Sequence, residues 1–321
     1  MSLLSIFATA ILPIVAIAAV GFVLGRVRKI AVEPLNTVTV YVLVPALVFY
    51  SLTTTELGGK TLIKVLVGVF VFIIVMVGLA EGVGRAMGVE EPIHSALVLV
   101  SAFSNSGNYG IPLSAFAFGA VGRATAVLYL VGQSVVIYTV GVYLASRSGG
   151  ARGLSALKMV FKLPLLYAVV LALAFRFLGL VPPADSAAMT TLKLVGDSSI
   201  PLMLILVGIQ LAGANYGAAL SRVGTANVLK LLVAPVIALA ITMTLDFSNL
   251  TVARVFVLEC ATPVAITPLI LLIELGEGRT ADGVSGPEYV SAAVLTTTLV
   301  SVPVLTFLIA ALETNFVGGL L

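Results

Sequence analysis

The sequence predicts an all-α membrane protein of ten transmembrane helices, arranged as two inverted five-helix repeats. Three observations lead to this fold. Of the 321 residues, 60% are hydrophobic and only 10% are charged, whereas a soluble domain carries about 25% charged residues. Long apolar segments recur along the chain, each near the roughly 20 residues that cross a bilayer. Two of these segments, at corresponding places in the two halves, are interrupted by polar residues and prolines.

The apolar segments follow one another with short connections. A longer polar stretch over residues 146–162 separates a first repeat (1–145) from a second repeat (163–321), and no basic residue precedes the first segment, so we expect a retained helix rather than a signal peptide. The expected spans are Leu4–Leu24, Leu35–Leu52, Leu62–Gly82, Ile93–Gly119, Ala124–Ala145, Leu163–Leu180, Met189–Leu211, Ala226–Leu245, Val252–Leu275 and Val290–Leu312.

Basic residues gather in alternate connections. Because cytoplasmic loops are enriched in Lys and Arg, the richer set is expected in the cytoplasm, which places both termini outside the cell. The net charge of +3 reflects this topology rather than nucleic-acid binding. The richer set is Arg26, Arg28, Lys29, Arg85, Arg147, Arg152, Lys158, Lys162, Arg222 and Arg279, and the poorer set is Lys60, Arg123, Lys193 and Arg254.

Traces of a duplication run through both halves. Leu62–Val67 matches Val228–Val233, and Ala126–Leu128 matches Ala293–Leu295. A repeat with an odd number of helices must lie upside down relative to its twin. Lys64 and Lys230 correspond in this alignment, and their place near helix ends favours side chains that reach the nearest interface.

The fourth and ninth expected spans are interrupted near their centres. Ser104 to Pro112 contains two Asn, two Gly and a Pro, and the ninth span contains Pro263 and Pro268. Proline and glycine weaken a helix, and non-helical backbone within a membrane is tolerated where it lines a cavity. We therefore expect these interruptions to form the substrate site. The candidate substrate-binding residues are Ser104, Asn105, Asn108, Gly110, Pro112, Thr262, Pro263 and Thr267.

Acidic side chains are scarce within the spans. Glu259 lies one turn before Pro263, where an idle carboxylate is costly, so it is the first candidate for a coupling ion. It either binds Na⁺ together with freed carbonyls or takes up a proton. Asp197 is the second candidate, although Lys193 one turn away also favours a local ion pair. One cysteine and one histidine exclude a disulfide and a multi-histidine metal site, and we expect no catalytic residue and no cofactor.

Three stretches resemble the auxin efflux carrier family, which includes plant auxin carriers and prokaryotic dicarboxylate carriers. Leu35-Asn36 followed by Tyr41–Tyr50 resembles the family's second helix. Ser104-Asn105 with Gly110–Leu113 resembles its first crossover. Pro263 with Pro268, then Pro287 and Val302–Val304, resembles the second crossover and the last helix. The resemblance spans essentially the whole chain.

This resemblance implies the fold of bile acid carriers and sodium/proton antiporters. Spans 1, 2, 6 and 7 would form a scaffold, and the other six a transport domain that moves as an elevator, often in a homodimer. The family's substrates are organic anions, and Asn105 matches the crossover amide that contacts the substrate carboxylate. Lys60 and Val264 replace an Asp and a Gln of the plant carriers, and the central loop is short. These departures argue against auxin itself and favour a prokaryotic carrier.

The expected function is secondary active transport of a small organic anion, a dicarboxylate or an auxin-like carboxylate, across the cell membrane by alternating access. Its expected partners are the substrate, the lipid bilayer and a second copy of the chain. A Na⁺/H⁺ antiporter of the same fold is the alternative, although it would favour paired acids near the crossover. An intramembrane enzyme would need a nucleophile–base pair or a metal site, and a channel needs no duplicated interrupted helices.

Overall fold

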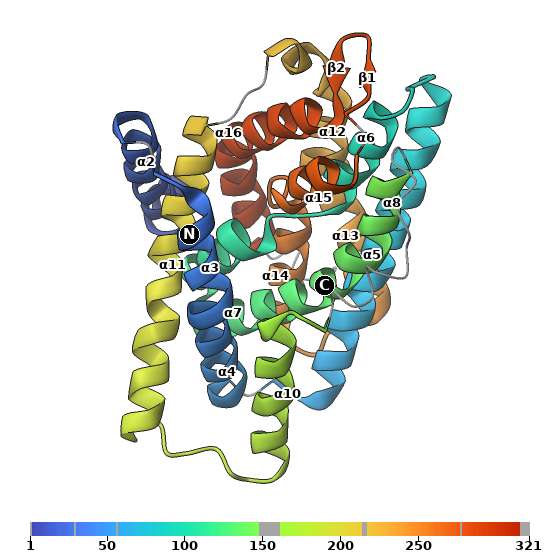
Figure 1. Ribbon diagram of the computed structural model, residues 1–321. Coiled ribbons are helices and arrows are strands. Elements are labelled where there is room, and N and C mark those ends of the chain that lie inside the picture. Colours follow the sequence, from blue (N-terminus) through green and yellow to red (C-terminus); the bar gives the residue numbers. More distant parts are fainter. Residues whose placement is uncertain are drawn as a thin grey trace.

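The computed structural model describes residues 2–28, 30–55, 57–147, 161–213, 217–276 and 278–314. Most of the expected 146–162 linker (148–160, with Arg152 and Lys158), Lys29, and residues 315–321 of the second repeat lie outside the described residues. The described chain is almost entirely helical (Figure 1).

Fifteen α-helices are described. Those of the first half are α1 (Leu3–Ile6), α2 (Leu12–Val27), α3 (Val32–Val38), α4 (Val44–Thr54), α5 (Gly59–Ala86), α6 (Ile93–Ala102), α7 (Ile111–Val136) and α8 (Val142–Ser146). Those of the second half are α10 (Pro164–Phe177), α11 (Ala187–Gly213), α12 (Gly224–Val228), α13 (Ala234–Leu245), α14 (Leu250–Ala261), α15 (Thr267–Leu275) and α16 (Gly286–Leu312), with a 3₁₀ turn over Gly217–Arg222.

A small hairpin departs from the expected all-α fold. Its strands, β1 (Thr280–Ala281) and β2 (Val284–Ser285), pair in antiparallel fashion. The two residues between them, Asp282 and Gly283, have positive φ angles of 48° and 76°. An Asp-Gly pair readily adopts this tight turn, so the local sequence favours a hairpin just before α16.

Several helices continue into one another through wider π-helical turns. Four of the five described π turns end two residues before a proline. Proline has no N–H and collides with the preceding turn of an α-helix, and a π turn accommodates the missing hydrogen bond without ending the helix. The π turns are Phe7–Ile11, Thr39–Leu43, Ser106–Gly110, Ile137–Gly141 and Leu229–Val233.

Seven helices of the described residues are long and apolar enough to cross a membrane. The shorter pieces are α6, α10, and the ninth expected span, which is divided into α14 and α15. The second part of the fourth expected span and the whole of the fifth run on from Ser106 to Ser146, divided at Gly119, whose φ of 62° and ψ of −144° favour glycine. The protein is therefore a multi-pass helical membrane protein. The seven are Leu3–Val27, Val32–Thr54, Gly59–Ala86, Ser106–Ser146, Ala187–Gly213, Gly224–Leu245 and Gly286–Leu312.

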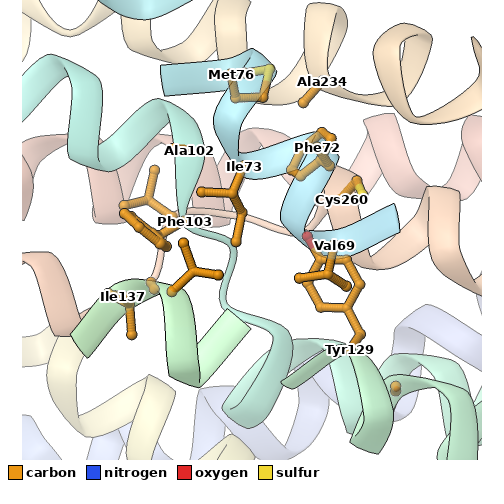
Figure 2. Packing of buried hydrophobic residues seen from close by; sticks show 14 of the residues in the cluster. Val69, Phe72, Ile73, Met76, Ala102, Phe103, Tyr129, Ile137, Ala234 and Cys260 are labelled. Carbon is orange, nitrogen blue, oxygen red and sulfur yellow. The ribbon is translucent and has the colours of Figure 1, made fainter. Parts of the chain in front are cut away.

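The helices pack in two groups. α11 lies along α2 and α4, and α10 packs on α4; these four helices occupy the left and lower part of Figure 1. In the other group α5 packs against α6 and α7, α14 packs against α7 and α13, and α16 packs against α6. Figure 2 shows the apolar interior of this second group, where Ile73 and Phe72 of α5 lie among Phe103, Tyr129 and Cys260.

Glycines bring α2 and α11 together. A Cβ atom added to Gly208 would overlap with the backbone of Ala18 and Phe22, and one added to Gly21 would overlap with the backbone of Ile205. Within lipid, helices gain little from burying apolar surface, so close backbone approach at small residues contributes much of their association. This contact fixes the first group of helices.

We expect Gly208→Leu to destabilise the protein by roughly 1–3 kcal/mol or more, because a side chain has no room between α2 and α11. The measurement is thermal unfolding of the purified chain in detergent. Gly78→Leu in α5 is the matched control, since nothing lies within 4 Å of a Cβ at Gly78. Equal melting temperatures for the two variants would contradict the role assigned to this contact.

Candidate functional site

The two interrupted helices meet and pair with each other. The chain leaves α6 after Ala102 and is non-helical until Ser106, and it leaves α14 after Ala261 and is non-helical until Thr267. Ser104 and Val264 form an antiparallel bridge. The Asn105 amide N–H donates to the Pro263 carbonyl at 2.7 Å, and the Ala265 N–H donates to the Phe103 carbonyl at 3.1 Å. We call residues 103–105 and 262–266 together the crossover.

Neighbouring side chains satisfy further backbone groups of the crossover. The Gln133 amide of α7 accepts from the Ser104 N–H at 3.0 Å and donates to the Ser104 carbonyl at 2.8 Å. The Val264 N–H donates to the Thr297 hydroxyl of α16 at 3.1 Å. An unpaired backbone group within a membrane costs several kcal/mol. These contacts explain how extended backbone persists in the interior of the protein.

The second half-helices start at the prolines that were expected to break them. Pro112 lies in the first turn of α7 and Pro268 in the first turn of α15. A proline at this position loses no helical hydrogen bond, because the first N–H groups have no intrahelical partner. The interruptions therefore fall on the N-terminal side of Pro112 and Pro268, and only Pro263 lies within non-helical backbone.

Lys230 corrects a prediction from the sequence. Its side chain is fully buried rather than directed to an interface. The ammonium donates to the Ser104 hydroxyl and, at 3.0 Å, to the Cys260 carbonyl, and it lies over the Phe72 ring, 5.8 Å from the centroid. The π turn Leu229–Val233 carries Lys230 on the face of its helix that packs on the crossover. Lys64, which the sequence aligns with it in the expected duplication, is partly exposed and donates to the Asp246 carbonyl.

Glu259 is also fully buried, at the end of α14. The Ser114 hydroxyl of α7 donates to its Oε1 at 2.6 Å, whereas its Oε2 has no hydrogen-bond partner in the structure. Gly110 lies directly against the carboxylate, and a Cβ there would overlap with it. Gly110 is thus needed for close approach of the π turn to Glu259.

A cavity of about 190 Å³ lies between the crossover and the first group of helices. Its walls come from α3, α4, α10 and α11 on one side and from the crossover, α7 and α15 on the other. None of the described residues that line it carries a formal charge. Its polar lining consists of amide and hydroxyl side chains, namely Asn36, Thr39, Ser104, Asn105, Asn108, Gln133, Ser134, Tyr138 and Thr267.

The candidate residues from the sequence divide into two sets. Ser104, Asn105, Asn108 and Thr267 line the cavity. Gly110, Pro112, Thr262 and Pro263 do not, because they lie behind it, in the packed interior or in the backbone pairing. Glu259 likewise does not line the cavity and is fully buried.

A larger cavity of about 680 Å³ adjoins the first. Both are lined by Asn36, Ile266 and Ile270. The larger one extends to the ends of α2 and α11 and the starts of α3 and α16, where Glu33 and Gly213 are exposed. This is the end that carries Arg26 and Arg28, which belong to the basic set expected in the cytoplasm.

Asp197 belongs to a separate ion-pair cluster. Its carboxylate accepts from Arg123 of α7 at 2.7 Å and from Lys193 at 2.6 Å. The Arg123 guanidinium also lies over the Tyr50 ring of α4, 5.5 Å from the centroid. Arg123 therefore joins α7 to both α11 and α4, across the two groups of helices.

Comparison with known proteins decides the family. A family model described as a membrane transport protein matches residues 6–309. The chain belongs to this family, the auxin efflux carriers. An uncharacterized transporter of Methanothermobacter thermautotrophicus is 29% identical over 272 residues, covering 82% of this chain and 87% of that protein. An uncharacterized transporter of Methanocaldococcus jannaschii is 23% identical over 270 residues, covering 81% and 87%.

In this auxin efflux carrier family member, residues that the sequence did not single out as functional contact the crossover or line the cavity. Gln133 and Lys230 are the main examples, and Asn36 and Thr39 add polar groups to the cavity. A glutamine and a lysine within apolar spans are themselves unusual, and this rarity could have marked both residues as candidates. Their partners lie 29 and 126 positions away at Ser104, which no local pattern indicates.

We expect Gln133→Leu to destabilise the carrier by roughly 1–3 kcal/mol for each polar group of Ser104 left without a partner. Thermal unfolding in detergent measures the loss. Ser134→Ala is the control, because the Ser134 hydroxyl donates only within its own helix, to the Leu130 carbonyl at 2.7 Å. A Gln133→Leu variant that unfolds at the temperature of Ser134→Ala would mean that the crossover does not depend on the amide.

Proposed function

We propose that this protein is a secondary active transporter of a small organic anion, a dicarboxylate or an auxin-like carboxylate, and that it works by alternating access across the cell membrane. The observation that carries the proposal is the cavity at the crossover, where amides, hydroxyls and helix starts converge in an uncharged pocket. Membership of a membrane transport family supports the reaction class.

The proposed architecture is ten spans in two inverted repeats, with both termini outside. The fourth span consists of α6 and residues 106–119, and the ninth consists of α14 and α15. Each is interrupted midway, and the two interruptions pair about a common point. Paired interrupted helices in corresponding positions of two halves are typical of carriers whose repeats are inverted.

We propose that the two packing groups of helices move relative to each other. α1, α2, α3, α4, α10 and α11, which cover expected spans 1, 2, 6 and 7, make up the scaffold, and the remaining helices make up the transport domain, in a homodimer. The cavity supports this division because each group supplies one of its walls. A substrate held there contacts the crossover on one side and the scaffold on the other, so movement of one group past the other changes its access.

Anion recognition follows from the chemistry of the transport-domain wall. Gly107 and Asn108, in the turn that leads into α7, and Thr267, at the start of α15, all line the cavity. Helix starts present unpaired N–H groups and a partial positive charge. The Asn105 side chain adds an amide, and it makes no cap hydrogen bond of its own. These donors suit a carboxylate.

Access in this conformation is from one end. The larger cavity leads from the crossover to the exposed residues Glu33 and Gly213, which we assign to the cytoplasmic side. Towards the other side, Arg123 links α7 to Asp197 and Tyr50 of the scaffold. We assign the structure to an inward-facing state, in which the Arg123–Asp197 ion pair closes the outer path.

A Na⁺/H⁺ antiporter remains the second candidate function, and Glu259 is the observation that favours it. An antiporter of ions alone has no use for the amide-lined cavity. Asp197, the other acid considered for ion coupling, is neutralised by two cations at the outer closure. We therefore propose that Glu259 carries the coupling, as a Na⁺ ligand or as a proton carrier, and that Asp197 is structural.

The first test of the function is uptake of labelled malate, malonate or indole-3-acetate into proteoliposomes, with and without ion gradients. Asn105→Ala should abolish this uptake while its melting temperature stays close to wild type, because the side chain faces the cavity rather than a packing partner. Asn249→Ala is the control for loss of an asparagine that does not line the cavity, since the Asn249 side chain caps α14. Near-normal apparent affinity in Asn105→Ala would remove this residue from the site.

Glu259→Gln tests the coupling, because it keeps the shape of the side chain and mimics the protonated state. With proton coupling, the variant should exchange substrate across the membrane but fail to concentrate it, and Na⁺ should have no effect on the wild type. With sodium coupling, Na⁺-stimulated uptake should disappear. Full gradient-driven accumulation by the variant would show that Glu259 is structural.

A further inference from the structure

The buried ammonium of Lys230 has the surroundings of a bound cation. Its donors reach the Ser104 hydroxyl and the Cys260 carbonyl, and the Phe72 ring lies beneath it. Cys260 lies in the last turn of α14, where carbonyls lack helical partners and the helix carries partial negative charge. Ser104 belongs to the other interrupted helix.

These ligands are the kind that hold a coupling cation in carriers with interrupted helices. In such carriers the C-terminal ends of half-helices and unwound backbone coordinate Na⁺ at the midplane. Here a carbonyl at a half-helix C-terminus and a hydroxyl at the crossover are both taken by Lys230. The Ser104 hydroxyl accepts from the ammonium and itself donates to the Cys260 carbonyl at 3.2 Å.

We propose that Lys230 is a tethered cation that permanently fills the cation position at the crossover, so that the carrier binds its substrate without Na⁺ and, of the two roles open to Glu259, the proton carrier is the one that applies. The ammonium holds the ends of the two interrupted helices together. This proposal rests on the proposed function for its effect on substrate, but the cation position itself is defined by the structure alone.

Lys230 does not line the cavity, but its charge lies close enough to act on it. No described lining residue is charged, so the cavity has no formal positive charge of its own to attract a carboxylate. Ser104 lines the cavity on one side and contacts the ammonium on the other. In the apolar interior a charge acts over several ångströms with little screening, so Lys230 is a positioning residue that favours anion binding through the crossover.

The other ionisable groups around Lys230 are consistent with this role. Glu259 is the buried acid of the same helix end and makes no direct ion pair with Lys230, since its carboxylate is held by Ser114. Cys260, whose carbonyl accepts from the ammonium, and Tyr129 in the same apolar cluster are also buried and titratable, and neither is a cation. A buried ammonium must be hydrogen-bonded to be tolerated, and the Ser104 hydroxyl and the Cys260 carbonyl supply these contacts.

The test that needs no substrate is cation rescue of thermal stability. The full chain is unfolded in detergent in choline, sodium or methylammonium chloride at equal ionic strength. Wild type should melt at the same temperature in all three salts. Lys230→Ala should melt lower in choline and should be restored, with saturation, by methylammonium or Na⁺, because a ligand that binds only the folded state stabilises it. Lys64→Ala, the matched lysine of the other repeat, should show no such rescue.

Saturable stabilisation of wild type by Na⁺ would overturn the proposal, as would a Lys230→Ala variant that no cation restores. Should Lys230→Ala fail to fold, Lys230→Gln keeps a donor of similar reach without the charge. Its apparent affinity for malonate in proteoliposomes should fall roughly 10-fold or more, as expected when a charged partner is lost, and unchanged affinity would overturn the proposal. If wild type transports none of the tested anions, the proposed function fails, while the thermal experiment still decides the role of Lys230.

Discussion

The structure depends on one constraint, which is that two helices must be interrupted deep inside a membrane protein where water cannot satisfy their backbone. The two interruptions satisfy each other's backbone groups, because they form an antiparallel bridge at Ser104 and Val264. Gln133 then supplies an amide to the Ser104 peptide, and Thr297 supplies a hydroxyl to Val264. Because each interruption needs the other, α6 and α14 are held at a fixed crossing, and the helices that carry Gln133 and Thr297 are fixed with them.

This crossing concentrates polar chemistry in an otherwise apolar interior. Lys230 donates to Ser104 and Cys260, and Glu259 accepts from Ser114. Both are fully buried, and no ion pair within the described part of the chain joins them. The two side chains have different hydrogen-bond partners, so each is held separately near the crossing. Gly110 makes this arrangement possible, because any larger residue would displace the Glu259 carboxylate.

The same crossing places a site between two groups of helices. The cavity borders the crossover on one side and α4, α10 and α11 on the other, so whatever it holds contacts both groups. The path from this cavity leads to one end of the molecule, and Arg123 joins the groups towards the opposite end. We propose that the amide-lined site, the path towards one end and the Arg123 ion pair towards the other serve alternating access.

The sequence by itself determined the features that depend on local chemistry. Apolar length identified a multi-pass helical membrane protein. The polar run from Ser104 and the Pro263 region marked where the two helices are interrupted, because proline and glycine act on their own turn. The tertiary structure alone decided which polar side chains meet. Lys64 and Lys230 lie in similar sequence segments, yet one is partly exposed and the other fully buried, because the latter contacts Ser104, which is 126 positions away. Asp197 had a visible local partner in Lys193, but its contact with Arg123 across 74 positions arises only when the two helix groups pack.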